Sequence, residues 1–262
     1  MKYLIPILGV LLILVVSCSP TVTPNTPVVT KIVLGSGEAG SGDTLELSWG
    51  AVTSAQGYYV YLDGNKNTTT ELTYYVVDPT KSIEVSAYNG SEESDKWTLS
   101  TAVAVTPTVT VYADSGSSSN DDAFGFNTSS GTCLALDITN SANYPSIDFV
   151  VENDGLSDIE FWSPDQYAPT PYNTKDNSVA SSTASSFDNL TKAADIGQQL
   201  YDTKFAGVSV NGIYSVWIQP VSGTFGSDNH FGKVFVNAIS GTQLTLETGY
   251  QLIGGLTWLI SQ

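Results

Sequence analysis

Apolar and polar residues alternate along short segments between residues 28 and 106, which is the pattern of strands with one buried face. Turn residues such as Asp63-Gly64-Asn65 and Asn89-Gly90 separate these segments. Short strands with turn residues at this spacing predict a β-sandwich. The alternating apolar positions are Leu45, Leu47 and Trp49, then Tyr58, Val60 and Leu62, then Ile83, Val85 and Ala87.

From Val109 onward the pattern again predicts mostly strands, over 146–151, 159–162, 213–218, 234–239 and 244–250. We expect one short helix, over Ser186–Tyr201, with Ser186 as its cap and Phe187, Leu190 and Ala194 on one face. Pro107, in Thr106-Pro107-Thr108, predicts a stiff link between two domains because it favours extended backbone before it. The predicted fold is all-β, with a first sandwich over 28–106 and a second, larger β-rich sandwich-like domain over 107–262.

The first segment resembles a fibronectin type III domain. The resemblance rests on Leu47-Ser48-Trp49, Ala55–Tyr61, Val85–Asn89 and Ser91–Ser94, in that order. It implies that Trp49 is the core tryptophan of the second strand and that the module acts as a spacer. Ile83 departs from the family, which often has the tyrosine of the tyrosine corner there. No Arg-Gly-Asp occurs, so integrin-type adhesion has no support.

The first 17 residues have the form of a signal peptide. Lys2 precedes an apolar run from Tyr3 to Val16, which is shorter than the roughly 20 residues that span a membrane. Val15-Val16-Ser17-Cys18 resembles the lipobox of bacterial lipoproteins. The resemblance implies cleavage before Cys18, lipid on its thiol and anchoring to the cell membrane or outer membrane, outside the cytoplasm. The alternative is a plain secretory signal with an incidental cysteine.

Residues 18–27 are rich in proline and threonine, a composition typical of an extended tether. The nine basic residues are all lysines and the formal net charge is −17. This charge excludes nucleic acid as a partner, because phosphate binding needs clustered basic side chains. A cationic partner, a neutral polysaccharide and a surface protein all stay open.

The cysteine at position 133 and the single histidine limit the reactions that the chain could catalyse. Cys133 lies in a strand-like run and is expected to be a small buried residue, and the chain has one histidine, His230. No nucleophile elbow, phosphate loop or zinc histidine pair occurs, so we expect no enzyme and no cofactor. A glycosidase would use two carboxylates at a set separation, and the chain has too many carboxylates for such a pair to be recognised by counting. A glycosidase therefore stays open.

A loop rich in proline and aromatic residues is the best candidate for carbohydrate binding, because exposed rings can stack on sugars beside amides and carboxylates. In the alternative, these rings cover the sandwich core. The candidate residues are Trp162, Asp165, Gln166, Tyr167 and Tyr172.

A second cluster carries oxygen ligands of the kind that calcium takes. Its residues do not have the spacing of an EF-hand loop, and the alternative is a solvated acidic turn. The candidate metal residues are Glu152, Asn153, Asp154 and Asp158. Asp114, Asp121 and Asp122 form a similar acidic group around a serine-rich loop.

The second half also shows a faint resemblance to HmuY-like haem-binding lipoproteins. The similar pieces are Phe126–Gly131, Ile147–Phe149, Ile213–Trp217, Gly232–Val236 and Tyr250-Gln251. With a single histidine, two-histidine haem ligation within one chain is excluded. The sequence therefore favours a lipid-anchored surface protein with a non-catalytic binding or attachment role, with a carbohydrate as the favoured ligand. A purely structural envelope protein is the alternative.

Overall fold

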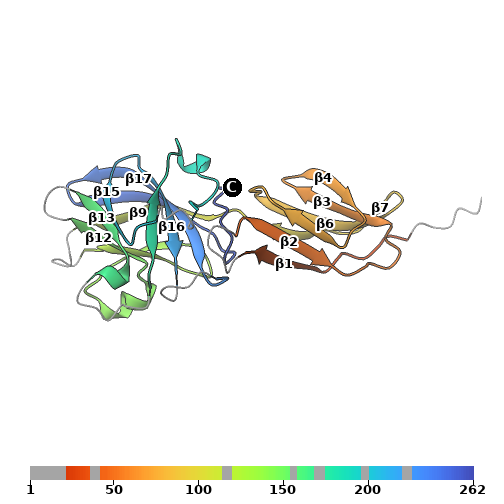
Figure 1. Ribbon diagram of the computed structural model, residues 1–262, viewed down its shortest axis with the longest axis horizontal. Helices are drawn as coiled ribbons and strands as arrows, with labels where there is room; N and C mark the ends of the chain where they lie inside the picture. Colours follow the sequence, from red (N-terminus) through yellow and green to blue (C-terminus); the bar gives the residue numbers. More distant parts are fainter. Residues whose placement is uncertain are drawn as a thin grey trace, which may run out of the picture.

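The computed structural model describes residues 22–35, 42–113, 120–153, 158–167, 175–195, 201–219 and 226–262. These residues form two β-sandwiches that lie end to end, with the C-terminus near the junction between them (Figure 1). The predicted all-β fold is confirmed. Three short 3-10 helices are the helical elements of the described residues: η1 (Ser141–Ser146), η2 (Pro164–Gln166) and η3 (Phe187–Asn189).

In the first sandwich, a sheet of three strands faces a sheet built around β3 and β6. The alternating residues of the sequence pattern supply its core, since Leu45, Leu47 and Val60 are fully buried. One sheet has the order β1 (Val29–Leu34), β2 (Thr44–Trp49), β5 (Thr73–Val76). The other has the order β4 (Asn65–Thr69), β3 (Gly57–Leu62), β6 (Ser82–Asn89), β7 (Glu92–Glu93), and β8 (Trp97–Ser100) also pairs with β6.

The second sandwich consists of two antiparallel sheets with an aromatic and aliphatic core between them. One sheet has the order β14 (Ser178–Ser181), β16 (Ile213–Ile218), β17 (His230–Ser240), β18 (Gln243–Tyr250), β9 (Ala104–Tyr112). The other has the order β11 (Cys133–Leu136), β10 (Ala123–Phe126), β12 (Phe149–Asn153), β13 (Ile159–Trp162), β15 (Lys204–Val208).

The predicted link at Thr106–Thr108 lies inside β9. Pairing with β18 already begins at Ala104, which is opposite Tyr250. The register between β9 and β18 shifts next to Pro107, and β9 is an edge strand of its sheet. A proline is tolerated at such a place because it lacks the N–H that a regular ladder needs. The second domain therefore begins before residue 107.

The end of the chain returns to the first domain. Leu256 and Trp258 are fully buried within the core of the first sandwich, next to Trp49 and its neighbours. The indole N–H of Trp258 donates to the carbonyl oxygen of Asp43 at 3.0 Å, and the backbone N–H of Thr257 donates to the carbonyl oxygen of Gly42 at 2.9 Å. The C-terminal segment therefore belongs to both domains.

The helix predicted over Ser186–Tyr201 is wrong for residues 186–195, and residues 196–200 lie outside the described residues. Only η3 is helical there, and at Lys192 the chain bridges to Trp258. Phe187 and Leu190 are buried as predicted, but their carbonyl oxygens accept hydrogen bonds from the ammonium of Lys233 at 2.7 and 3.2 Å. Those carbonyls are therefore engaged by a side chain from the sheet.

The signal peptide and Cys18 lie outside the described residues, and the helices of the described ranges are all too short or too polar to cross a membrane. The tether is described from Val22. Its prolines Pro24 and Pro27 are buried, so this part of the tether packs on the first domain. Side chains of the first domain also hold it, since the amide of Asn89 donates to the carbonyl oxygen of Val22 at 3.4 Å.

Candidate functional site

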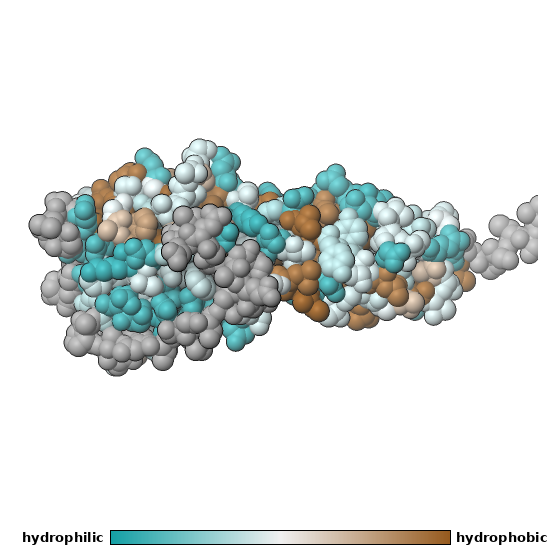
Figure 2. All heavy atoms as spheres, in the orientation of Figure 1, coloured by the Kyte–Doolittle hydropathy of each residue, from teal (hydrophilic) through white to brown (hydrophobic). Residues whose placement is uncertain are grey.

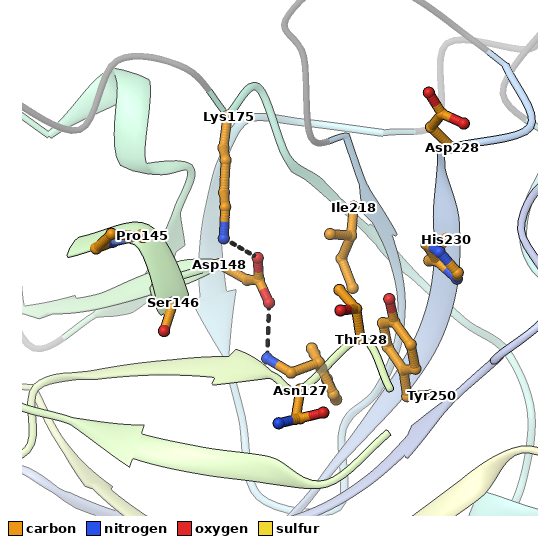
Figure 3. Close-up of a pocket in the computed structure, with 11 residues that line it drawn as sticks. Asn127, Thr128, Pro145, Ser146, Asp148, Lys175, Ile218, Asp228, His230 and Tyr250 are labelled. Atoms are coloured by element: carbon orange, nitrogen blue, oxygen red, sulfur yellow. Dashed lines mark hydrogen bonds and ion pairs between the residues drawn. The ribbon is translucent and has the colours of Figure 1, made fainter. Parts of the chain in front are cut away.

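A pocket of about 270 Å³ lies at one end of the second sandwich, between its two sheets. Residues at the ends of four strands line it. Phe126 is the last residue of β10, Ile218 the last of β16 and Tyr250 the last of β18, while His230 is the first residue of β17. In Figure 3, Asp148 and Lys175 lie on one side of the space, and Ile218, Tyr250 and His230 lie on the other. The two facing sheets thus bring together residues that are far apart in sequence.

An ion pair forms one wall of the pocket. The ammonium of Lys175 donates to Asp148 Oδ1 at 2.8 Å and to the carbonyl oxygen of Ile147 at 3.0 Å. Asp148 Oδ2 accepts from the backbone N–H of Phe126 at 2.7 Å, and only 3% of the Asp148 side chain is exposed. A lysine ammonium has three N–H donors, so one remains for the pocket that Lys175 lines.

Three stacked rings form the opposite wall. Tyr250 lies between Phe126 and His230, with ring centroids 5.1 and 5.0 Å away and interplanar angles of 22° and 20°. Both faces of the Tyr250 ring are therefore covered, and only its hydroxyl edge points to the pocket (Figure 3). Tyr250 is fully buried and its hydroxyl has no hydrogen-bond partner.

The protonation of two of these rings follows from their contacts. Burial, together with the charge of Asp148, raises the pKa of the Tyr250 phenol, so the hydroxyl keeps its proton at neutral pH. His230 Nδ1 lies 2.8 Å from the carbonyl oxygen of Gln251. Because a carbonyl only accepts, Nδ1 carries a proton, and in the neutral imidazole Nε2 is then an acceptor.

The residues predicted for carbohydrate binding lie elsewhere, at the end of β13 and in η2. Trp162 and Tyr167 are half-buried against an apolar cluster on the outer side of the β10–β12 pair, and their planes meet at 66°. They do not form one flat stacking surface, and the ammonium of Lys204 lies 3.6 Å from the centre of the Trp162 ring. Gln166 donates to Asp165, and Tyr172 lies outside the described residues.

The residues predicted for calcium are only partly described, because Asp154 lies outside the described residues. Glu152 is buried and Asn153 is half-buried at the end of β12, while Asp158 is exposed just before β13. Burial and the nearby charge of Glu152 raise the pKa of the Tyr167 phenol. Across the described ranges, no three His, Cys, Asp or Glu side chains gather as a metal site would require.

The ion pair of the pocket was not predicted from the sequence. Asp148 stands between Ile147 and Phe149 in an apolar run, and a carboxylate placed there needs a buried partner. That signal marks Asp148 as unusual, but nothing in the sequence pairs it with Lys175. Several lining residues belong to the segments from which the sequence predicted a HmuY-like domain, namely Phe126, Asn127, Thr128, Asp148 and Tyr250.

Cys133 is buried at the start of β11, as expected. Burial raises the pKa of its thiol to about 12. Since the thiolate is the reactive form, this cysteine is chemically inert at neutral pH.

No family model matches the chain, and no curated protein matches it. Among solved structures, a DUF4466 family protein from Parabacteroides merdae is 13% identical, with a TM-score of 0.42, over 87% of this chain and 99% of that chain. A segment of chicken tenascin with two fibronectin type III domains is 13% identical, with a TM-score of 0.21, over 87% and 97%. An FN3tt mutant is 27% identical, with a TM-score of 0.23, over 29% and 92%.

The first domain, by its own strand order and its buried Trp49, is a fibronectin type III-like sandwich.

Proposed function

We propose that this protein is a lipid-anchored surface protein whose second sandwich binds a carbohydrate, without catalysis, in the pocket at Tyr250. The observation that carries the proposal is the buried Tyr250 hydroxyl, which has no partner and points to the pocket. Leaving such a group unpaired costs about 1–3 kcal/mol. A ligand oxygen that accepts from it recovers that cost, which makes the pocket a place for a hydroxyl-rich ligand.

The chemistry of the lining residues supports binding rather than catalysis. The ammonium of Lys175 donates to Asp148 and to the carbonyl oxygen of Ile147, so its N–H groups act as hydrogen-bond donors. Burial raises the pKa of Tyr250, so its phenol is a poor acid and a poor nucleophile. Fixed hydrogen-bonding groups beside an apolar wall are instead typical of ligand recognition.

The position of the tether supports a role at the surface. Thr23 donates to Glu92 at 3.2 Å, beside β7. In Figure 1, β7 lies at the end of the first domain that faces away from the second domain. A lipid on Cys18 would therefore leave the fibronectin type III-like domain next to the membrane and hold the second sandwich away from it.

Binding is tested by thermal unfolding of the unlipidated chain, residues 19–262, against neutral and charged glycans, calcium and haemin. A glycan at 100 times its dissociation constant adds about 2.7 kcal/mol, or roughly 5–10 °C at this size. A shift with haemin alone would favour the HmuY-like alternative. If none of these compounds shifts the transition, the binding proposal fails and a purely structural role becomes the better account.

Anchoring is tested in a bacterial host by labelling with a radioactive fatty acid. The wild-type chain is expected to incorporate the label and to stay with the membrane fraction, whereas Cys18→Ala is released or retained with its signal peptide. Cys133→Ala is the matched control and should label like the wild type. Equal labelling of the Cys18→Ala chain would contradict the lipobox.

A further inference from the structure

The charges of the pocket restrict the kind of sugar that it can take, if the proposed function holds. Asp148 and Lys175 neutralise each other, and the remaining carboxylate, Asp228, is exposed at the rim. The chain as a whole carries a formal charge of −17. An anionic sugar would therefore enter against a negative potential and find no uncompensated cation.

A cationic amino sugar is also disfavoured. Both oxygens of Asp148 already accept hydrogen bonds, one from Lys175 and one from the backbone N–H of Phe126. An ammonium placed in the pocket would lose its hydration and gain no free carboxylate. The pocket is thus suited to an uncharged ligand.

The pocket offers two donors that need acceptors. One is the Tyr250 hydroxyl, and the other is the third N–H of the Lys175 ammonium. A carbonyl oxygen has two lone pairs and can accept from both. A hydroxyl oxygen is a weaker match, because a hydroxyl also brings a proton that must be placed.

Apolar groups lie beside these donors. The ring of Phe126 and the side chains of Ile218 and Pro145 line the same pocket. Ile218 is 5% exposed and Phe126 is 6% exposed, so both present only a small apolar surface to the pocket. His230 Nε2, as an acceptor, is suited to an amide N–H.

We propose that the pocket recognises a neutral sugar through an acetamido group. The acetamido carbonyl accepts from Tyr250 and Lys175, its methyl packs on Ile218 and Phe126, and its N–H donates to His230. This inference deepens the proposed function, because it names the class of sugar at the same site.

The test is calorimetric titration of the chain with four β-1,4-linked glucose-type oligosaccharides of equal length: N-acetylated, free amine, plain hydroxyl and uronic acid. The N-acetylated oligosaccharide is expected to bind at least tenfold more tightly than each of the others. Monomeric N-acetylglucosamine and N-acetylgalactosamine, added as competitors, separate the acetamido group from the geometry of the linkage.

Two variants locate the binding. Tyr250→Phe removes one hydroxyl without a partner, so it should fold normally and weaken binding of the N-acetylated sugar about tenfold. Tyr214→Phe is the matched control: it removes a buried hydroxyl that accepts from the backbone N–H of Ser209, away from the pocket. Thr128→Trp, at the exposed rim, should block the pocket and abolish binding.

The outcomes separate the two proposals. Tight binding of a charged or plain oligosaccharide that Tyr250→Phe weakens would keep the proposed function and overturn the acetamido inference. Binding of the N-acetylated sugar that neither Tyr250→Phe nor Thr128→Trp changes would place it outside the pocket and overturn the inference as well. Binding of none of the sugars would remove both.

Discussion

Several residues of the second sandwich are polar or charged and yet almost fully buried. Asp148 is buried beside the pocket and pairs with Lys175, whose side chain is 18% exposed, and Lys233 is fully buried under η3. A buried charge is tolerated only when its partners are in place, because the loss of one partner leaves the other without compensation. Substitutions of these residues are therefore expected to change the free energy of unfolding.

Lys175→Met removes the partner of a carboxylate that is 3% exposed. We expect the free energy of unfolding to fall by about 3–5 kcal/mol, as measured by urea denaturation. Asp148→Asn combined with Lys175→Met removes both charges and should recover more than half of the loss. If the double variant is as unstable as Lys175→Met alone, the ion pair does not explain the loss.

Lys233 gives a prediction for pH. Desolvation lowers the pKa of its ammonium to about 8, from 10.5 for a free lysine, although Asp188 and Glu247 raise it in part. Between these values the unfolded chain binds more protons than the folded chain, so the free energy of unfolding rises with pH from 8 to 10.5. Below pH 8 the amine is protonated in both states, and it adds no pH dependence there. The change is of the order of 3 kcal/mol.

The measurement is the urea midpoint of the wild type and of Lys233→Met from pH 7 to pH 10. The wild type should gain stability relative to the variant above pH 8, because the variant lacks the titrating amine. The comparison cancels other groups, such as buried tyrosines, that titrate in both chains. Parallel pH profiles would show that Lys233 keeps an ordinary pKa.

At the scale of elements, the pocket depends on the close approach of β10 and η1. A Cβ on Gly125 would collide with the carbonyl oxygen of Ser146, so only glycine lets these elements lie so close. Gly125→Ala should cost about 3 kcal/mol in urea denaturation and weaken ligand binding, since Phe126 and Ser146 line the pocket. Gly50→Ala, where nothing lies within 4 Å of the new Cβ, is the control and should behave like the wild type.

The elements also show how far the sequence predicts the structure. Alternation identified β2, β3 and β6 because one face of each is buried, and the buried face was predicted correctly. The helix at Ser186 was predicted from local apolar spacing, whereas the carbonyl oxygens of Phe187 and Leu190 accept from Lys233, a residue more than 40 positions away, and such a contact leaves no signal in the local pattern. The pocket was missed for the same reason: Phe126, Asp148, Lys175 and Tyr250 meet only through sheet packing, which leaves no local spacing.

At the scale of the whole molecule, the two sandwiches share a junction rather than a loose link. Besides Trp258, Lys192 pairs with Asp43 at 2.8 Å, and the amide of Gln251 donates to the carbonyl oxygens of Thr101 and Trp258. Figure 2 shows apolar atoms on the first domain next to the narrow junction. The fibronectin type III-like domain is therefore expected to unfold together with the second sandwich.

Trp258→Ala tests this coupling. It removes a fully buried indole from the core of the first domain and should cost about 3–5 kcal/mol. In calorimetry the wild type should unfold in one transition, and the variant should show a separate, earlier transition of the first domain. Trp162→Ala, which removes a half-buried indole of the second domain, is the control. Two independent transitions in the wild type would contradict the shared junction.

In the proposed function, the second sandwich binds a sugar through the buried hydroxyl of Tyr250. The most direct measurement is the affinity of the N-acetylated oligosaccharide for the wild type and for Tyr250→Phe, together with the thermal stability of both chains without ligand. We expect the variant to be as stable as the wild type, or more stable, and to bind about tenfold more weakly. A variant that is less stable but binds equally well would overturn the proposed role of Tyr250, because the hydroxyl would then stabilise the fold and not bind a ligand.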